Sequence, residues 1–212
     1  ISSDTRRMIG GLEDESEALR ECESLECDLS ADVILDLCGG TGSWSKPYKA
    51  AGYRVISVDT WFGRGDVRLM EFDPDLMPVR GILCAPPCTH FAASGAQYWD
   101  AKGNSALIHG LSIVDACLRA IVFYKPKWWA LENPKGRLIN YIGSPTMVFE
   151  PYEYGDPYTK LTYLWGSFIQ PKKTPVDPWL GSFTHDDGGR RSTRDRSITP
   201  SGFANAFFAA NP

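Results

Sequence analysis

The 212-residue sequence lacks several features that mark whole classes of protein. No apolar run approaches the roughly 20 residues that a membrane-spanning helix needs. The first ten residues, ISSDTRRMIG, lack the apolar stretch of a secretory signal peptide. The six cysteines do not follow the paired CxxC pattern of a zinc site, which favours reduced thiols in an intracellular protein. We therefore expect a cytoplasmic protein with neither a membrane segment nor a bound metal.

Charge is distributed unevenly along the chain. The formal net charge is -4, but residues 1–30 carry nine acidic and three basic side chains, a balance of -6. Residues 31–212 therefore have a balance of +2. The length and the 43% apolar content favour one globular domain with an appendage. We expect residues 1–30 to form an acidic head that is helical or partly disordered.

From residue 31 onward, short apolar runs alternate with helical patterns. The runs predict strands at 33–38, 54–59, 66–70, 81–87, 128–134, 146–155 and 160–166. Helical spacing predicts helices at about 44–51 and over 105–123. This order indicates an α/β fold, a mostly parallel sheet with helices on both faces. Such sheets bind ligands at the carboxyl ends of their strands.

The last forty residues differ in composition from the rest. Residues 171–198 are rich in Pro, Gly and basic side chains, which predicts a mobile loop. Residues 199–212 predict a helix that Thr199 or Ser201 caps and that packs Phe203, Ala206 and Phe207 onto the main domain. The predicted division is therefore 1–30, 31–170, 171–198 and 199–212.

A glycine turn follows the first predicted strand, in DLCGGTG at 36–42. Such a turn lets backbone N–H groups approach a ligand closely, although GxGxxG does not fit. Asp59 ends the next strand, where a carboxylate accepts ribose hydroxyls, and Trp61 is placed to stack on adenine. Asp66 with Val67 is placed to receive an adenine amino group. These residues predict a site for an adenosine-bearing cofactor; the alternative is that Asp36 and Asp59 cap helices and Trp61 is core.

Two further strand ends carry reactive side chains. Cys88 follows two prolines that stiffen its loop, and a thiolate there is suited to attack an electron-poor ring carbon. Cys84, inside the strand, fits a buried structural thiol. Glu132 follows the apolar run WWAL, so desolvation is expected to raise its pKa and allow proton donation near neutral pH. The alternative for Glu132 is a salt bridge to Lys135 or Arg137.

These residues resemble the cytosine-C5 DNA methyltransferases. DLCGGTGSWS, VISVDTW and GDV resemble the first three motifs of that family, APPCTHFAASG its Pro-Cys motif and ALENP its Glu-Asn motif. TPSGFANAFF resembles the final motif, which packs beside the cofactor. The resemblance covers most of residues 32–170 and the last fourteen or so. It implies a Rossmann-like S-adenosylmethionine-dependent methyltransferase fold, with the catalytic domain at 31–170, in a bacterial or phage-infected cell.

The resemblance also implies a reaction and a set of residues. Cys88 attacks carbon 6 of a flipped-out or single-stranded cytosine, Glu132 protonates ring nitrogen 3, carbon 5 takes the methyl group, and Asn133 orients the loop. The implied cofactor-binding residues are Asp36, Leu37, Cys38, Gly39, Gly40, Thr41, Gly42, Asp59, Thr60, Trp61, Asp66, Val67 and Pro86. The expected substrate-binding residues are Pro87, Thr89, Lys160, Arg190, Arg191, Arg194 and Arg196.

The sequence departs from the family at two places. The Gln-x-Arg-x-Arg motif of the family is missing, and Lys160 is the only base in the corresponding stretch TKLTYLWG. The target-recognition domain is reduced to some 30 residues before Thr199, whose bases can contact phosphates. We expect a short or relaxed recognition site, or a partner protein that supplies specificity. The alternatives to DNA methylation are methylation of RNA or of a free cytosine nucleotide, and a non-catalytic nucleic-acid-binding protein on this fold.

Overall fold

The computed structural model describes residues 32–183 and 193–212 of the chain, and Val33–Pro212 form one compact unit. The acidic head predicted at 1–30 lies outside the described residues. In the described part, the strands are β1 (Val33–Leu37), β2 (Arg54–Val58), β3 (Val79–Cys84), β4 (Trp128–Pro134), β5 (Met147–Phe149) and β6 (Thr162–Ser167). The α-helices are α2 (Lys46–Ala50), α3 (Trp99–Tyr124), α4 (Ile139–Ile142), α5 (Thr193–Ser197) and α6 (Ser201–Ala210).

The six strands form one mixed sheet in the order β2-β1-β3-β4-β6-β5. The pairs β2·β1, β1·β3 and β3·β4 are parallel, whereas β6 runs antiparallel to both β4 and β5. The carboxyl ends of β1, β2, β3 and β4 therefore lie at one edge of the sheet. The predicted α/β fold is confirmed, with an antiparallel extension at one side.

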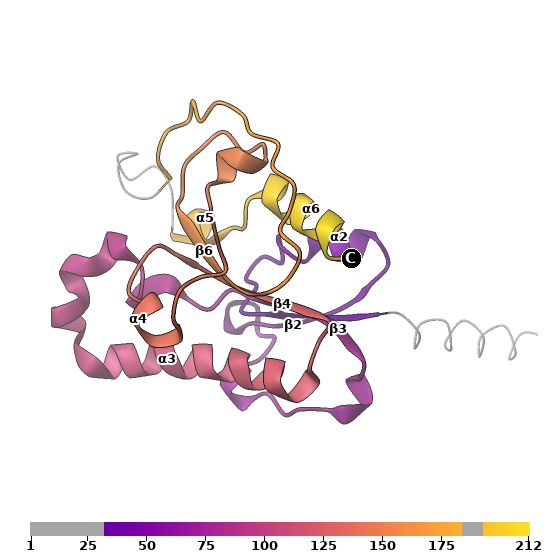
Figure 1. Cartoon of the computed structure of the whole chain (residues 1–212). Helices are drawn as coiled ribbons and strands as arrows, with labels where there is room; N and C mark the ends of the chain where they lie inside the picture. The colour runs from indigo at the N-terminus through magenta and orange to yellow at the C-terminus, as the bar shows by residue number, and fades with distance from the viewer. Residues whose placement is uncertain (1–31, 184–192) are drawn as a thin grey trace, which may run out of the picture. The chain divides into compact units, whose positions relative to one another are not determined.

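The core has two layers because side chains alternate between the faces of the strands. Leu35 and Leu37 of β1 face α3, where they join Val114 and Cys117 in one cluster. Ile34, directly before Leu35, faces the other way and joins a second cluster with residues of α2 and α6. Helices consequently cover both faces of the sheet, α3 on one side and α2 with α6 on the other (Figure 1).

Helix α3 was predicted over 105–123 and is longer, Trp99–Tyr124, with a break at Gly103, whose φ is +70°. Within the described residues, Ala93–Tyr124 is long and apolar enough to cross a membrane by length and composition. Its Asp115 and Arg119 form an i,i+4 ion pair on the exposed face, and Val114 and Cys117 lie in the core. The helix therefore packs an apolar face into the core, while its exposed face carries this ion pair together with Ile108 and Val122.

The predicted strand at 66–70 is wrong. Val67–Leu69 forms a 3-10 turn, η2, whose first N–H groups are capped by the Asp66 carboxylate, which accepts a hydrogen bond from Arg68 N at 2.9 Å. Local side-chain-to-backbone bonds of this kind compete with strand pairing. The sequence pattern did not reveal that the carboxylate would fold the backbone at this point.

The last helix forms where it was predicted, but neither predicted residue caps it. Pro200 occupies the N-cap position and makes no side-chain cap bond. Asp156 instead accepts hydrogen bonds from Gly202 N at 2.8 Å and from Ser201 Oγ at 3.2 Å. Phe203 and Phe207 are fully buried, and the Phe203 ring stacks on Phe149 with centroids 3.9 Å apart. The Asp156 carboxylate, from a loop distant in sequence, thus caps the helix in place of a local side chain.

Candidate active site

The glycine turn after β1 is shaped by a buried carboxylate. Gly40 and Gly42 have positive φ angles of +54° and +74°, and Gly42 N donates to Gly39 O at 2.9 Å. A Cβ atom on Gly39 would lie 2.0 Å from Asp36 Oδ1, so only glycine fits there. Asp36 is 1% exposed and accepts a hydrogen bond from Ser45 Oγ, and burial raises its pKa. Asp36 therefore supports the turn from within the protein.

The end of β2 holds the other side of the same turn. Asp59 Oδ2 accepts from Gly40 N at 2.9 Å, and its Oδ1 accepts from Trp61 N at 2.7 Å. Asp59 caps the 3-10 turn η1 (Thr60–Phe62), as the alternative reading of this residue required. Trp61 is 59% exposed, so the interpretation of Trp61 as core is wrong. An exposed indole beside a fixed carboxylate and an open glycine turn fits an adenosine-bearing group.

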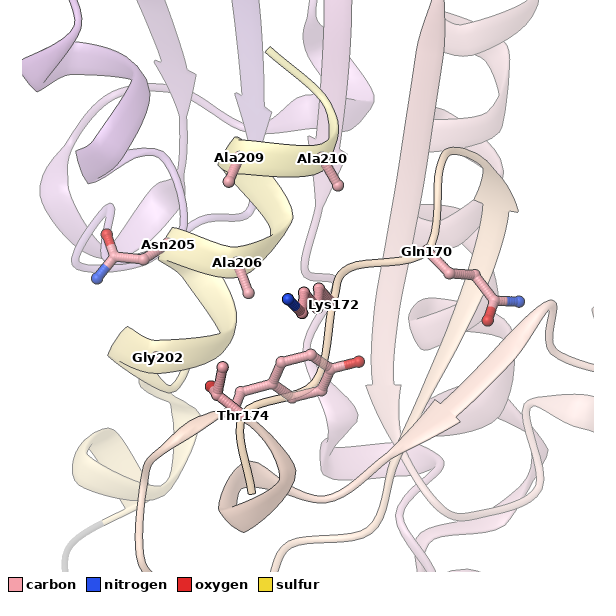
Figure 2. A pocket seen from close by; sticks show the side chains of 9 residues that line it. Gln170, Lys172, Thr174, Gly202, Asn205, Ala206, Ala209 and Ala210 are labelled. Atoms are coloured by element: carbon pink, nitrogen blue, oxygen red, sulfur yellow. The ribbon is translucent and has the colours of Figure 1, made fainter. Parts of the chain in front are cut away.

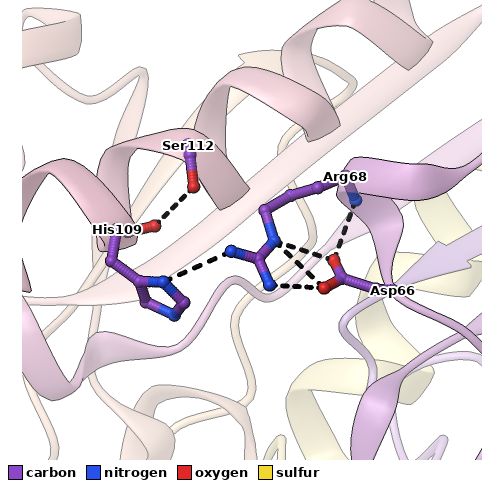
Figure 3. A network of polar contacts seen from close by, with 4 residues as sticks. All are labelled: Asp66, Arg68, His109 and Ser112. Carbon is purple, nitrogen blue, oxygen red and sulfur yellow. Dashed lines mark hydrogen bonds and ion pairs between the residues drawn. The ribbon is translucent and has the colours of Figure 1, made fainter.

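Asp66 lies in a polar network that the sequence did not predict (Figure 3). Its carboxylate accepts hydrogen bonds from Arg68 Nε and Nη2, and these bonds lower the pKa of Asp66. Arg68 Nη1 also lies 3.2 Å from His109 Nδ1 on α3. A guanidinium only donates, so His109 Nδ1 is the acceptor in this contact. The Arg68 bonds thereby favour the ionised form of Asp66 at the start of η2.

The remaining predicted cofactor residues differ in burial. Leu37 and Val67 point into the core, so only their main chains are available to a ligand. Thr41 and Thr60 are exposed, and Pro86 is buried. Cys38 adopts φ +58° and its half-buried thiol contacts Cys117, which together with burial raises its pKa.

Cys88 begins the 3-10 turn η4 (Cys88–His90) directly after β3 and the two prolines. Its thiol is half-buried, whereas Cys84 inside β3 is fully buried, as predicted. Burial, followed by the negative charge of Glu132, raises the pKa of Cys88, and the positive charges of Lys160 and Arg196 oppose this. The thiol therefore lies within the electrostatic reach of a carboxyl group, an ammonium and a guanidinium.

Glu132 lies inside β4, beyond the point where β3 ends. Leu131 pairs with Cys84, the last residue of β3, while Glu132 pairs only with Leu164 of β6. Its side chain is 15% exposed, and burial raises its pKa. The alternative of a salt bridge to Lys135 or Arg137 is wrong: the partner is Lys160, whose Nζ lies 3.8 Å from Glu132 Oε1. Arg137 instead donates to His90 O at 2.7 Å.

Asn133 joins the two strand ends. It is fully buried, and its Nδ2 donates to the carbonyl oxygen of Pro86 at 2.9 Å. Pro86 lies two residues before Cys88, so the amide ties the stiff loop to β4. This contact places Asn133 where it can orient the Cys88 loop.

The predicted substrate-side residues are only partly described. Pro87 and Thr89 are exposed on either side of Cys88. Arg190 and Arg191 lie outside the described residues, and only the backbone of Arg194 is described, within α5. Arg196, also on α5, acts electrostatically on Cys88. The structure thus brings Cys88, Glu132, Lys160 and Arg196 together.

Two cavities open on the described surface. One, of about 410 Å³, is lined by Lys160, Leu161, Pro134, Ala93 and Ser94 among others, and so adjoins the strand ends of β4 and β6. The other, of about 570 Å³, lies between α6 and the segment around Lys172 (Figure 2). No predicted site residue lines this second cavity. The first cavity therefore adjoins the candidate site through Lys160, and neither Cys88 nor Glu132 lines it.

Several supporting residues were missed in the sequence. Arg64 donates to Gly40 O at 2.8 Å, and Glu150 accepts from Lys160 N. Arg68 had a usable signal, because it stands two residues after a predicted ligand-binding acid. Arg64 and Glu150 had none, since their partners lie 24 and 10 residues away along the chain.

Comparison with known proteins supports the resemblance. No family model matches the sequence. It is 29% identical over 124 residues to the type II methyltransferase M.DdeI of Desulfomicrobium norvegicum, covering 50% of this chain and 28% of that protein. This chain thus matches well under two thirds of its relative's length.

Two solved structures are also similar to the chain. One is described as a DNA modification methyltransferase encoded within a prophage of Escherichia coli, with TM-score 0.44, 18% identity and coverage of 64% of this chain and 46% of that one. The other is the Entamoeba histolytica methyltransferase EhMeth, with TM-score 0.45, 12% identity and coverage of 70% and 58%. Within the described ranges, no cluster of three or more His, Cys, Asp or Glu is arranged to hold a metal. By its motifs and by this alignment, about half of the chain is similar to a type II methyltransferase.

Proposed function

We propose that this protein transfers a methyl group from S-adenosylmethionine to carbon 5 of cytosine in DNA, through a covalent Cys88 adduct at carbon 6. The proposal rests on one observation: Cys88, Glu132 and Asn133 lie near one another at adjoining strand ends. Asn133 bonds the loop that presents Cys88, and Glu132 is buried with a raised pKa. A nucleophile, an acid and a positioning amide are the parts that this addition requires.

The cofactor side is proposed to use the ends of β1 and β2 together with Asp66 at the start of η2. Gly39–Gly42 and Asp59 form one hydrogen-bonded unit, and exposed Trp61 stands beside it. Asp59 retains lone pairs for ribose hydroxyls after accepting two N–H groups. Asp66 is ionised and offers an acceptor for an adenine amino group. Bound S-adenosylmethionine would supply an electrophilic methyl group at this edge of the sheet.

The chain's own residues would carry the proton and covalent steps. The Cys88 thiolate adds to carbon 6, and the protonated Glu132 carboxyl donates its proton to ring nitrogen 3, so that electrons move toward carbon 5. After carbon 5 has taken the methyl group, a base removes its proton, the bond from Sγ to carbon 6 breaks, and nitrogen 3 returns its proton to Glu132. A raised pKa keeps Glu132 protonated nearer to neutral pH, as a donor must be.

DNA is the proposed substrate, with the target base flipped out or single-stranded. The basic residues of 171–198 are proposed to contact phosphates, and a partner protein is one source for the specificity that this short segment lacks. We expect the reaction to take place in the cytoplasm of a bacterial or phage-infected cell. Methylation of RNA or of a free cytosine nucleotide is the second candidate, because only some 30 residues stand before Thr199 in place of a recognition domain.

The test incubates the full-length chain with methyl-labelled S-adenosylmethionine and, separately, duplex DNA, single-stranded DNA, tRNA and deoxycytidylate. We expect labelled 5-methylcytosine in DNA, and none with Cys88→Ser because the adduct cannot form. Cys22→Ser, in the acidic head and outside the matching region, is the matched control and should retain activity. Preference for tRNA or deoxycytidylate would establish the second candidate instead.

A non-catalytic protein is distinguished by trapping. DNA that carries 5-fluorocytosine has no removable proton at carbon 5, so an active Cys88 stays covalently attached. The wild-type chain and the Cys22→Ser control should give a stable adduct, and Cys88→Ser should not. Absence of both adduct and labelled base on every substrate would contradict the proposal.

A further inference from the structure

Both main-chain polar groups of Lys160 are hydrogen-bonded to side chains at the candidate site. Its N–H donates to Glu150 Oε2 at 2.5 Å, and its carbonyl oxygen accepts from Thr162 Oγ1 at 2.7 Å. The residue is 7% exposed, in contrast to the ordinary position of lysine at the surface. Both backbone groups of Lys160 are thus fixed by side chains, which limits where the ammonium can go.

The fixed ammonium faces Glu132 on the neighbouring strand. Lys160 Nζ and Glu132 Oε1 are 3.8 Å apart, and the two side chains are only 8% and 15% exposed. Lys160 also lines the 410 Å³ cavity beside the site. Solvent screens a charge in this position poorly, so its field extends to neighbouring groups.

Resting on the proposed function, we propose that Lys160 is a positioning residue that sets where on the pH scale the reaction runs, by favouring the thiolate of Cys88 and the carboxylate of Glu132 together. This one buried cation thereby displaces both limbs of the pH profile in the same direction. Addition requires the thiolate, and proton donation requires the carboxylic acid, so activity is confined to the interval in which both forms are present.

The charges around the two groups support this role. Burial raises the pKa of Cys88 and so does Glu132, while Lys160 and Arg196 lower it. Burial raises the pKa of Glu132, and Lys160 opposes that shift through its charge and a hydrogen bond. Lys135 and Glu150 also line the cavity with Lys160. Removal of the Lys160 charge should therefore move both titrations to higher pH.

The test measures the pH dependence of Cys88 alkylation by iodoacetamide in the full-length protein, read at the Cys88 peptide by mass spectrometry. Lys160→Met should move the midpoint upward by about one pH unit, the lower end of the shift that one opposite charge near an ionisable group produces. Below the midpoint, that shift slows alkylation about tenfold at fixed pH. Lys160→Arg keeps the charge and should leave the midpoint near the wild-type value.

Methyl transfer is measured in parallel across pH. In Lys160→Met both limbs of the pH profile should move upward, since thiolate formation and loss of the Glu132 proton are both delayed. A lower amplitude at an unchanged midpoint would mean a merely structural lysine and would overturn the proposal. Glu132→Gln removes the opposing charge and should move the alkylation midpoint of Cys88 downward, provided that Lys160 remains.

The two hypotheses fail in different ways. Alkylation does not depend on methyl transfer, so a shifted midpoint without any methylated product would retain the role of Lys160 and reject the proposed function. Methylation with an unshifted midpoint in Lys160→Met would do the reverse. If Lys160→Met fails to fold because Glu132 is left unpaired, the double variant Lys160→Met/Glu132→Gln removes both buried charges. It is compared with Glu132→Gln alone, and equal midpoints in these two proteins would overturn the proposal.

Discussion

At the scale of single residues, the candidate site depends on Asn133 more than its motif suggests. The amide is fully buried, and its only described partner is the Pro86 carbonyl, 2.9 Å away. The contact connects the strand of Glu132 to the loop of Cys88. Loss of the amide therefore affects folding and chemistry together.

Asn133→Ala leaves the buried Pro86 carbonyl without its donor. An unsatisfied buried acceptor costs about 1–3 kcal/mol, so we expect the free energy of unfolding to fall by that amount. Covalent trapping on 5-fluorocytosine DNA should also slow, because the Cys88 loop loses its tie to β4. Urea unfolding measures the first effect and adduct formation the second. Asn140→Ala, at an exposed position of α4, is the control and should stay within about 0.5 kcal/mol of wild type; equal stabilities for the two variants would contradict the assigned contact.

The environment of a single residue could be predicted from the sequence where its type and the apolar run beside it leave few possibilities. The glycine turn, the buried Cys84 and the burial of Glu132 followed from apolar runs and strand ends. The partner of Glu132 did not, because Lys160 follows it by 28 positions and reaches it only through the antiparallel β4·β6 pairing. Nothing in the sequence pattern states which strand returns beside β4.

At the scale of elements, α6 completes one face of the sheet through a close approach at Gly202. A Cβ atom there would lie 1.8 Å from Tyr154 O, on the 3-10 turn η6 (Pro151–Tyr154). The approach brings Phe203 onto Phe149 and lets Asp156 cap the helix. The glycine is thus a packing requirement and not a helix preference.

Gly202→Ala tests this reading because two effects oppose each other. Alanine favours a helix interior over glycine by up to about 1 kcal/mol, which would stabilise α6. The clash with the η6 backbone should dominate and lower the free energy of unfolding by about 1–3 kcal/mol. Gly95→Ala has open space around the added methyl and is the control. A stability of Gly202→Ala at or above wild type in urea unfolding would show that α6 does not approach η6 this closely.

Helices and strands could be predicted from the sequence where an apolar pattern is long. The prediction was wrong where a side chain binds the backbone and folds it. The apolar runs at 33–38, 54–59 and 128–134 form β1, β2 and β4, with ends close to the predicted ones. The run at 66–70 does not form a strand, because Asp66 caps the next N–H and Arg68 folds back onto it. The antiparallel direction of β6 was also missed, since a single strand carries no sign of its direction.

At the scale of the whole molecule, charge is separated along the chain in a way that bears on the proposed substrate. Residues 1–30 have a balance of -6 and residues 31–212 a balance of +2. A polyanion is attracted by the second part and repelled by the first. The net charge of -4 therefore hides two opposing contributions to DNA binding.

Replacing the nine acids of residues 1–30 by their amides, in the full-length chain, removes only the repulsive contribution. We expect tighter binding to a DNA duplex at 50 mM salt, measured by fluorescence anisotropy. The gain should shrink as salt rises, because the Debye length falls to about 3 Å at 1 M. A control that exchanges each Asp for Glu and each Glu for Asp keeps the charge and should bind as wild type does. If the amide variant binds no more tightly than this control at low salt, the acidic head does not oppose DNA binding, and its charge must then act on something other than the proposed substrate.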